Sequence, residues 1–146
     1  MHSYLTLGIS EGATVAAGGP GTVDGLSGEY VRPTVFSNVR NDMRIAQEEI
    51  FGPVITVIPY DDEADAVRLA NDSAYGLGGS VWTKDRAAGL EIAKQIRTGT
   101  FGINNYAPGF EAPFGGFKSS GIGREYGPEA IEEFTELQSI YGVPQP

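Results

Sequence analysis

Cysteine is absent from the 146 residues, and histidine occurs once, as His2. The absence of cysteine excludes disulfide bonds, cysteine-ligated zinc and thiol catalysis by these residues. His2 stands next to the first methionine, where we expect an exposed side chain without a catalytic role. Any chemistry here would depend on carboxylates, hydroxyl groups, backbone amides or a lysine such as Lys118, and we expect neither a catalytic residue nor a metal site.

Long apolar runs and gathered positive charge are lacking as well. No stretch approaches the roughly 18 apolar residues that span a bilayer, and the chain does not open with a basic segment followed by an apolar one. The net charge is −9, whereas phosphate binding needs lysine and arginine side chains clustered on one face. We therefore expect a cytoplasmic protein that binds neither membranes nor nucleic acid.

The composition is that of a globular protein. Apolar residues make up 40% of the chain and aromatic residues 10%, and there is no low-complexity tract. A domain of this length removes roughly 70% of its unfolded surface from water. The sequence therefore predicts one compact domain.

The order of the predicted elements favours an α/β fold. The β-branched run Val54–Tyr60 is typical of a strand that is buried on both faces of a parallel sheet. A helix is predicted at Glu63–Asn71, a strand at Gly79–Thr83, a second helix at Asp85–Arg97 and a third strand at Thr100–Asn104. This alternation with short connections predicts parallel strands joined by crossover helices.

Shorter elements are predicted at both ends of the chain. At the C-terminal end we expect a helix at Pro128–Phe134 and an extended tail at Thr135–Val143. Such a terminal strand either pairs within the fold or adds to the sheet edge of a neighbouring chain. The N-terminal predictions are a helix at His2–Glu11, a strand at Thr14–Ala17, a loop at Gly18–Gly28, an extended segment at Tyr30–Val35 and a helix at Met43–Glu49.

A glycine-rich segment follows the third predicted strand. Parallel sheets bind ligands beyond the carboxyl ends of their strands, so Asn104–Glu125 is the first place to expect a site. The segment is not a P-loop, because Phe117 separates Gly116 from Lys118. It is not a dinucleotide fingerprint either, because Tyr126 stands where the third glycine belongs. A tight structural loop and a loop that approaches a ligand are both compatible with these residues.

Two adjacent carboxylates, Glu48 and Glu49, precede Phe51 and a Gly-Pro pair. Neighbouring residues on a helix point about 100° apart, so the two carboxylates do not form a shared-proton acid and base. From the residues alone, a solvated helix end followed by a core phenylalanine is favoured over a binding site.

Read together, the sequence blocks resemble the NAD(P)-dependent aldehyde dehydrogenase superfamily. The resemblance is most specific where the Met43–Pro53 and Pro113–Glu125 blocks occur together at this distance. It implies a partial three-layer α/β sheet with mostly parallel strands and crossover helices. Residues 1–134 would be the C-terminal portion of the catalytic domain, and residues 135–146 an oligomerisation strand and tail. The remaining blocks are Glu29–Phe36, Ala70–Asp72 with Tyr75–Leu77, Val81–Thr83 with Asp85, and Gly99–Thr100 with Ile103–Asn104.

The resemblance also implies roles for single residues. Glu49 corresponds to the glutamate that hydrogen-bonds the nicotinamide ribose, and Phe51 to the aromatic residue near the nicotinamide ring. Phe114 corresponds to an aromatic residue that lines the aldehyde pocket, and Asn104 ends a strand close to that pocket. Lys118–Glu125 is similar to the loop that braces the site.

The reaction of the family begins with attack of a cysteine thiolate on the aldehyde, followed by hydride transfer to NAD or NADP and hydrolysis of the thioester. The sequence begins after the region where that cysteine would lie. We therefore expect a fragment that is inactive alone and binds no cofactor alone. The alternative is a non-catalytic remnant that only binds to or co-assembles with intact subunits. In both cases we expect the strand at 137–143 to pair with another subunit, in a homo-oligomer or in association with other subunits. These residues indicate neither the aldehyde nor the choice between NAD and NADP.

Overall fold

The computed structural model describes residues 1–107 and 109–142. The chain forms two compact units, Met1–Ser73 and Ala74–Pro146. The length had predicted one compact domain, and the chain is instead divided in the short connection that follows the helix at Glu63–Asn71. The predicted boundary between residues 134 and 135 concerns a different division and stays a prediction.

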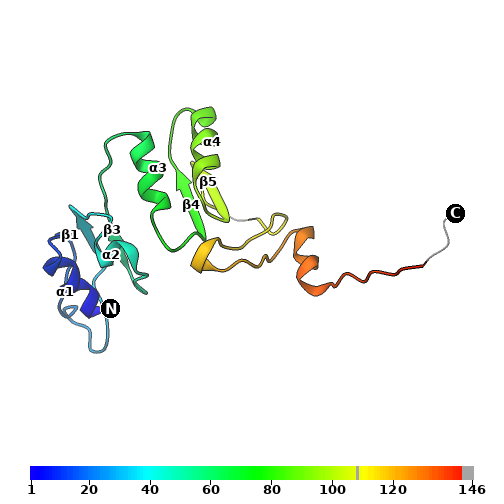
Figure 1. The fold of residues 1–146 in the computed structure, drawn as a ribbon. Coiled ribbons are helices and arrows are strands. Elements are labelled where there is room, and N and C mark those ends of the chain that lie inside the picture. The colour runs from blue at the N-terminus through cyan, green and yellow to red at the C-terminus, as the bar shows by residue number, and fades with distance from the viewer. Residues whose placement is uncertain (108, 143–146) are drawn as a thin grey trace. The chain divides into compact units, whose positions relative to one another are not determined.

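The first unit contains a mixed three-stranded sheet with the strand order β1-β2-β3 (Figure 1). β1 pairs with β2 in antiparallel orientation, and β2 pairs with β3 in parallel orientation. The helices and strands of this unit are α1 (His2–Ser10), β1 (Thr14–Ala17), β2 (Thr34–Ser37), α2 (Arg44–Gln47), β3 (Val54–Thr56) and α3 (Glu63–Asn71).

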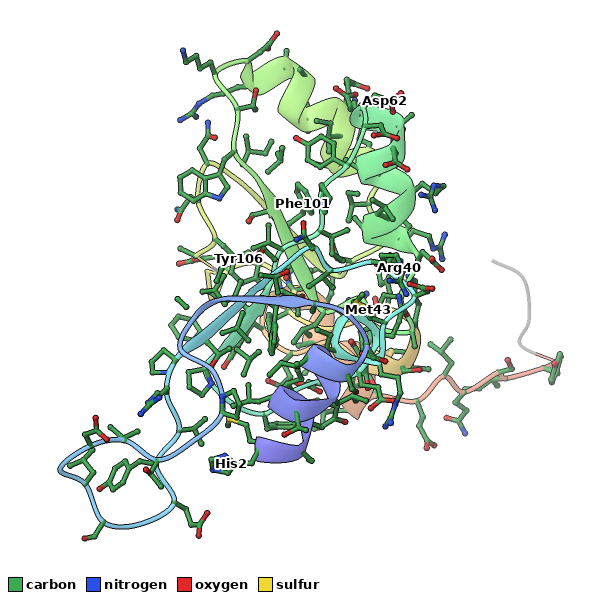
Figure 2. The ribbon with its side chains drawn as sticks, turned by 90° about the vertical axis from the view of Figure 1, so that its left-hand side faces the viewer. His2, Arg40, Met43, Asp62, Phe101 and Tyr106 are labelled. Atoms are coloured by element: carbon green, nitrogen blue, oxygen red, sulfur yellow. The ribbon has the colours of Figure 1, made fainter. Side chains whose placement is uncertain are left out.

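Helices α1 and α2 pack against the sheet around a small apolar core. Gly8 permits close packing, because a Cβ there would lie 3.0 Å from the ring of Phe36 and 3.0 Å from Ile45. Phe36 is completely buried, and burial of a phenylalanine side chain contributes about 1.5–3 kcal/mol. His2 is exposed at the start of α1, as expected (Figure 2). The buried apolar residues are Leu5, Ala13, Phe36, Val39, Met43 and Ile45.

The second unit contains two parallel strands, β4 (Gly78–Val81) and β5 (Thr100–Ile103), connected by α4 (Arg86–Gln95). Helix α4 begins after Asp85, whose carboxylate accepts hydrogen bonds from two backbone N–H groups of the first turn. The helix packs on the strand pair through Gly89, where a Cβ would lie 3.0 Å from Thr83 and 3.1 Å from Ile103. The expected strand, helix and strand are therefore confirmed in this unit.

The prediction for Val54–Tyr60 was wrong in length and in burial. β3 ends at Thr56, and Ile55 and Tyr60 are 61% and 63% exposed. β3 pairs with β2, while β4 and β5 form a separate sheet, so the described strands do not form one continuous parallel layer. The buried residues of the first unit cover only part of its sheet. Outward-facing side chains of β3 therefore remain exposed to water.

β2 begins four residues later than the extended segment predicted from Tyr30. Pro33 explains the late start, because proline has no backbone N–H to donate to a strand ladder. Thr34 is the first residue to join the sheet region, and its N–H donates to the carbonyl of Pro53 over 2.9 Å. The overall α/β class is nevertheless confirmed by the helices and by the parallel pairs β2–β3 and β4–β5.

The C-terminal part of the second unit has little regular structure. Residues Lys118–Ser120 and Pro128–Phe134 form 3₁₀ helices, the second of them where a helix was predicted. Within the described range, residues 135–142 are exposed and form no strand. The predicted oligomerisation strand at 137–143 and the tail at 135–146 extend beyond the described residues at position 143, and pairing with another chain stays a prediction. Across residues 1–107 and 109–142, no helix has the length and apolarity to cross a membrane.

Candidate functional site

Glu48 ends helix α2 and is held by donors from two helices. Its backbone is extended (φ −103°, ψ 146°). The hydroxyl of Tyr4 on α1 donates to Oε2 over 2.7 Å, and Arg44 at the start of α2 donates to Oε1 over 2.6 Å and to Oε2 over 3.0 Å. The Arg44 and Tyr4 hydrogen bonds lower the pKa of Glu48. Glu48 is therefore a structural carboxylate that stays ionised.

Glu49, the next residue, has a different environment. Its side chain is exposed, and in the described part of the chain its carboxylate forms no hydrogen bond or ion pair. Successive side chains of an extended backbone point to opposite sides. Because Glu48 points toward Tyr4, Glu49 points toward solvent. Its oxygens are therefore available to accept hydrogen bonds from a ligand.

Phe51 lies outside the core and is 83% exposed. The prediction of a core phenylalanine was therefore wrong, because Phe36 of β2 already fills the position beneath α1. A large exposed aromatic ring two residues from a carboxylate without a partner is a feature of ligand-binding surfaces. The sequence alone did not distinguish an exposed phenylalanine from a buried one.

Phe114 lies in the second unit at the edge of an open groove of about 660 Å³. It forms a two-residue antiparallel bridge with Glu125, with N···O distances of 2.7 and 2.8 Å in the two directions. The ring of Tyr126 lies 6.4 Å from the ring of Phe114 and 4.9 Å from that of Phe110, the latter edge to face. The apolar residues that line the groove are Leu77, Phe114, Tyr126, Ala130 and Phe134.

The glycine-rich loop that leads from Phe114 to Glu125 is held by Arg124. Nη1 of this residue donates to the carbonyls of Gly116 and Gly123 over 2.9 and 2.8 Å, and the guanidinium carbon lies 5.4 Å from the centre of the Phe117 ring. Gly99 has no room for a side chain, because a Cβ there would overlap the carbonyl of Gly115. The loop therefore packs closely on the amino ends of β4 and β5, whereas the sequence had predicted a site beyond the carboxyl ends of the strands.

The backbone amides of this loop are used within the protein. The N–H of Phe117 donates to Gly76, that of Ser119 to Ala74 and that of Ser120 to Phe117. A phosphate-binding loop would instead direct such N–H groups at its ligand. Of the two interpretations that the residues permitted, this geometry favours the tight structural loop.

Asn104 follows β5 and uses its whole side-chain amide on the backbone of Thr83. Nδ2 donates to the Thr83 carbonyl over 2.7 Å, and Oδ1 accepts from the Thr83 N–H over 2.7 Å. The backbone of Asn104 has φ +56°, a left-handed conformation that asparagine tolerates better than most residues. Two residues later, the hydroxyl of Tyr106 forms a hydrogen bond of 2.8 Å with the hydroxyl of Thr100 on β5. The side chain of Asn104 thus adds two hydrogen bonds beyond the ends of the paired strands β4 and β5.

The four predicted site residues lie in different units. Glu49 and Phe51 belong to the first unit, and Asn104 and Phe114 belong to the second. Their assignment to cofactor and aldehyde binding stays a prediction. Among the described residues, no group of three or more histidine, aspartate or glutamate side chains could hold a metal ion.

Sequence reasoning missed the residues that position these candidates. Arg44 and Glu48 stand four residues apart, a spacing at which opposite charges pair on a helix, so the sequence could have predicted this ion pair. The contact of Glu48 with Tyr4, 44 residues away, left no signal in the sequence. The same is true of Arg124, whose three carbonyl acceptors depend on how the loop folds.

The sequence of the chain is similar to known enzymes over nearly its whole length. Residues 1–140 match the family described as Aldehyde dehydrogenase family. A geranial dehydrogenase of Castellaniella defragrans is 51% identical over 141 residues, which are 97% of this chain and 29% of that protein. A putative aldehyde dehydrogenase of Staphylococcus aureus is 50% identical over 143 residues, which are 97% of this chain and 30% of that protein.

Solved structures agree in fold as well as in sequence. The aldehyde dehydrogenase of Mycobacterium tuberculosis, complexed with NAD+, has a TM-score of 0.89 and 55% identity over 97% of this chain and 30% of its own. Aldehyde dehydrogenase C of Pseudomonas syringae, complexed with NAD+ and octanal, has a TM-score of 0.89 and 48% identity over 92% of this chain and 28% of its own. The chain therefore spans about 30% of the length of the relatives that it matches.

Proposed function

The chain belongs to the aldehyde dehydrogenase family, and from this premise we propose that residues 1–134 form the C-terminal portion of the catalytic domain of an NAD(P)-dependent enzyme that oxidises aldehydes to carboxylic acids. In the proposed whole enzyme a cysteine thiolate attacks the aldehyde to form a thiohemiacetal. The 146 residues contain no cysteine, and we propose that the chain is inactive alone. The observation that carries this proposal is the exposed pair of Glu49 and Phe51, which has no partner within the first unit.

The geometry of this pair fits the nicotinamide end of the cofactor. A carboxylate without a partner can accept from both hydroxyls of a ribose, and an exposed phenyl ring offers a flat face to a second ring. When bound, the nicotinamide supplies the hydride acceptor. Glu49 would orient the ribose and Phe51 would shield the ring from water. Relatives with solved structures hold NAD+, which favours NAD over NADP for this chain.

The groove beside Phe114 is the proposed site for the aldehyde. The apolar part of its lining would keep water from the reacting carbonyl. Asn104 does not line this groove, because it follows the carboxyl end of β5 and the groove lies beside Leu77, at the amino end of β4. Octanal in the P. syringae structure and the name of the C. defragrans relative support an aldehyde with a hydrocarbon chain.

A second function is favoured by the C-terminal tail. Leu137, Ile140 and Tyr141 are exposed apolar side chains in an extended segment. Such a segment suits addition to the sheet edge of another subunit. In this alternative the chain is a cytoplasmic, non-catalytic remnant that co-assembles with intact subunits through the strand at 137–143.

The test is aldehyde-dependent reduction of NAD+ or NADP+, followed by absorbance. We expect no reduction by the purified chain alone. Co-refolding with the part of a relative that this chain does not match, which brings the cysteine and the nucleotide-binding residues, should produce activity. In that complex Glu49→Gln should lower kcat/KM about tenfold, as expected for the loss of about 1.4 kcal/mol of charge-assisted hydrogen bonding.

The control is Glu29→Gln, which neutralises another exposed carboxylate of the first unit and should leave activity unchanged. Reduction by the chain alone would contradict the proposal of an inactive fragment. A stable complex without activity would favour the second function instead.

A further inference from the structure

The two adjacent carboxylates at the end of α2 have opposite environments. Glu48 receives three hydrogen bonds from Tyr4 and Arg44, whereas Glu49 is exposed and has no partner in the described part of the first unit. A solvated helix end would leave both carboxylates free. The difference therefore points to a task for Glu48 that Glu49 does not share.

Glu48 links α2 to α1 through its hydrogen bond with Tyr4. A second link is made by Glu11, the residue after α1, which accepts from the N–H groups of Arg44 and Ile45 over 2.9 and 3.4 Å. Glu11 thus holds the beginning of α2, and Glu48 holds its end. Met43, which precedes α2, is buried in the core (Figure 2).

Helix α2 needs these links because it is short. It comprises Arg44–Gln47, and a helix of one turn is unstable by itself, since nucleation costs more than one turn of hydrogen bonds returns. The direction in which the chain leaves α2 is therefore set by side-chain contacts. Glu48 is the last residue with such contacts before Glu49, and Ile50, which precedes Phe51, packs against the core.

We propose that Glu48 is a positioning residue for the cofactor-binding segment. By pointing toward Tyr4 it fixes the backbone at the exit of α2, and the alternation of an extended chain then directs Glu49 outward. The network of Glu48, Tyr4 and Arg44 preorganises Glu49 and Phe51 before the ligand arrives, which lowers the entropy cost of binding. This inference rests on the proposed function of Glu49 and Phe51.

The test uses the 146-residue chain without ligand and measures backbone ¹⁵N order parameters and the ¹⁹F spectrum of 4-fluorophenylalanine at position 51. In the natural sequence we expect order parameters at 49–51 near the rigid value of about 0.85 and one narrow ¹⁹F resonance. Glu48→Ala should lower these order parameters below about 0.6 and shift the ¹⁹F resonance, while residue 36 in β2 keeps its rigid value.

Two further variants separate positioning from folding. Glu48→Gln keeps one oxygen acceptor for Tyr4 and should restore part of the order at 49–51. Tyr4→Phe removes only the hydroxyl donor and supplies the same measurement if Glu48→Ala does not fold. The matched control is Glu49→Ala, which changes the neighbouring carboxylate and should leave the order of residues 50–51 unchanged.

Unchanged order at 49–51 in Glu48→Ala and Tyr4→Phe would overturn the inference. So would an equal loss of order throughout the first unit, because that result describes a general structural role. These measurements need no cofactor, so their failure is distinct from failure of the proposed function. Conversely, if the co-refolded complex were inactive, the order parameters would still test whether Glu48 positions the segment.

Discussion

Asn104 uses a polar side chain as a continuation of backbone pairing. Its amide donates to and accepts from Thr83, and its backbone has φ +56°. The family resemblance had implied that Asn104 ends a strand close to the aldehyde pocket. The geometry adds a structural role, because the bonds to Thr83 hold the ends of β4 and β5 together where the chain turns toward Tyr106.

Asn104→Ala should destabilise the chain by about 2 kcal/mol, because it removes two partly buried hydrogen bonds and leaves the backbone groups of Thr83 without their partner. Asn104→Asp should cost less, since a carboxylate can still accept from the Thr83 N–H but cannot donate to the carbonyl. Urea unfolding measures both. Asn105→Ala, at the exposed neighbouring residue, is the control, and an equal effect of the two alanine variants would refute this role.

At the scale of the elements, side-chain carboxylates determine where helices begin and how they associate. Asp62 caps α3 by accepting from the N–H of Asp65 over 2.8 Å, and Asp85 caps α4. Such caps contribute about 1 kcal/mol each. Glu11 and Glu48 act instead between elements, linking α1 to α2. A capping residue can be predicted from the sequence because it stands next to its helix, whereas a link between two helices cannot.

The hydrogen bonds of Glu48 should make the free energy of unfolding depend on pH. Because hydrogen bonds from Arg44 and Tyr4 lower the pKa of Glu48 below its ordinary value of 4.5, its contribution is complete above pH 4.5 and is lost as the pH falls through the lowered pKa. Glu48→Gln should therefore reduce the loss of stability between about pH 5 and pH 3. Urea midpoints across this range measure the effect, with Glu49→Gln as control. An unchanged slope in Glu48→Gln would contradict the expectation.

At the scale of the whole molecule, the apolar core is unevenly distributed. Every buried large apolar side chain of the described residues lies in the first unit. In the described part of the second unit only glycines are fully buried, and Trp82 is 74% exposed. Exposed apolar surface of this extent usually marks a surface that contacts other protein. The relatives, more than three times as long, have additional residues that could cover it.

We therefore expect the isolated chain to self-associate in the micromolar range, because exposed apolar surface and unpaired strand edges promote association. Sedimentation velocity measures this. Trp82→Ser should shift the distribution toward monomer, whereas Leu26→Ser, at an exposed apolar residue in the loop of the first unit, should not. A monodisperse monomer of the natural sequence would count against the expectation.

The sequence by itself determined the features that depend on neighbouring residues. Helix α3 begins and ends as predicted because Asp62 caps it and apolar residues recur at helical spacing. The strand, helix and strand of the second unit and the family motifs follow from local order in the same way. The absence of cysteine needs no structure at all.

Only the tertiary structure decided which side chains are buried, paired or free. It separated Glu48 from Glu49 by bringing Tyr4 to one of them across 44 residues. It also left Phe51 in water, because Phe36 occupies the core, and it ended β3 at Thr56. These outcomes depend on contacts between distant segments, whose free energies are not encoded in any local pattern.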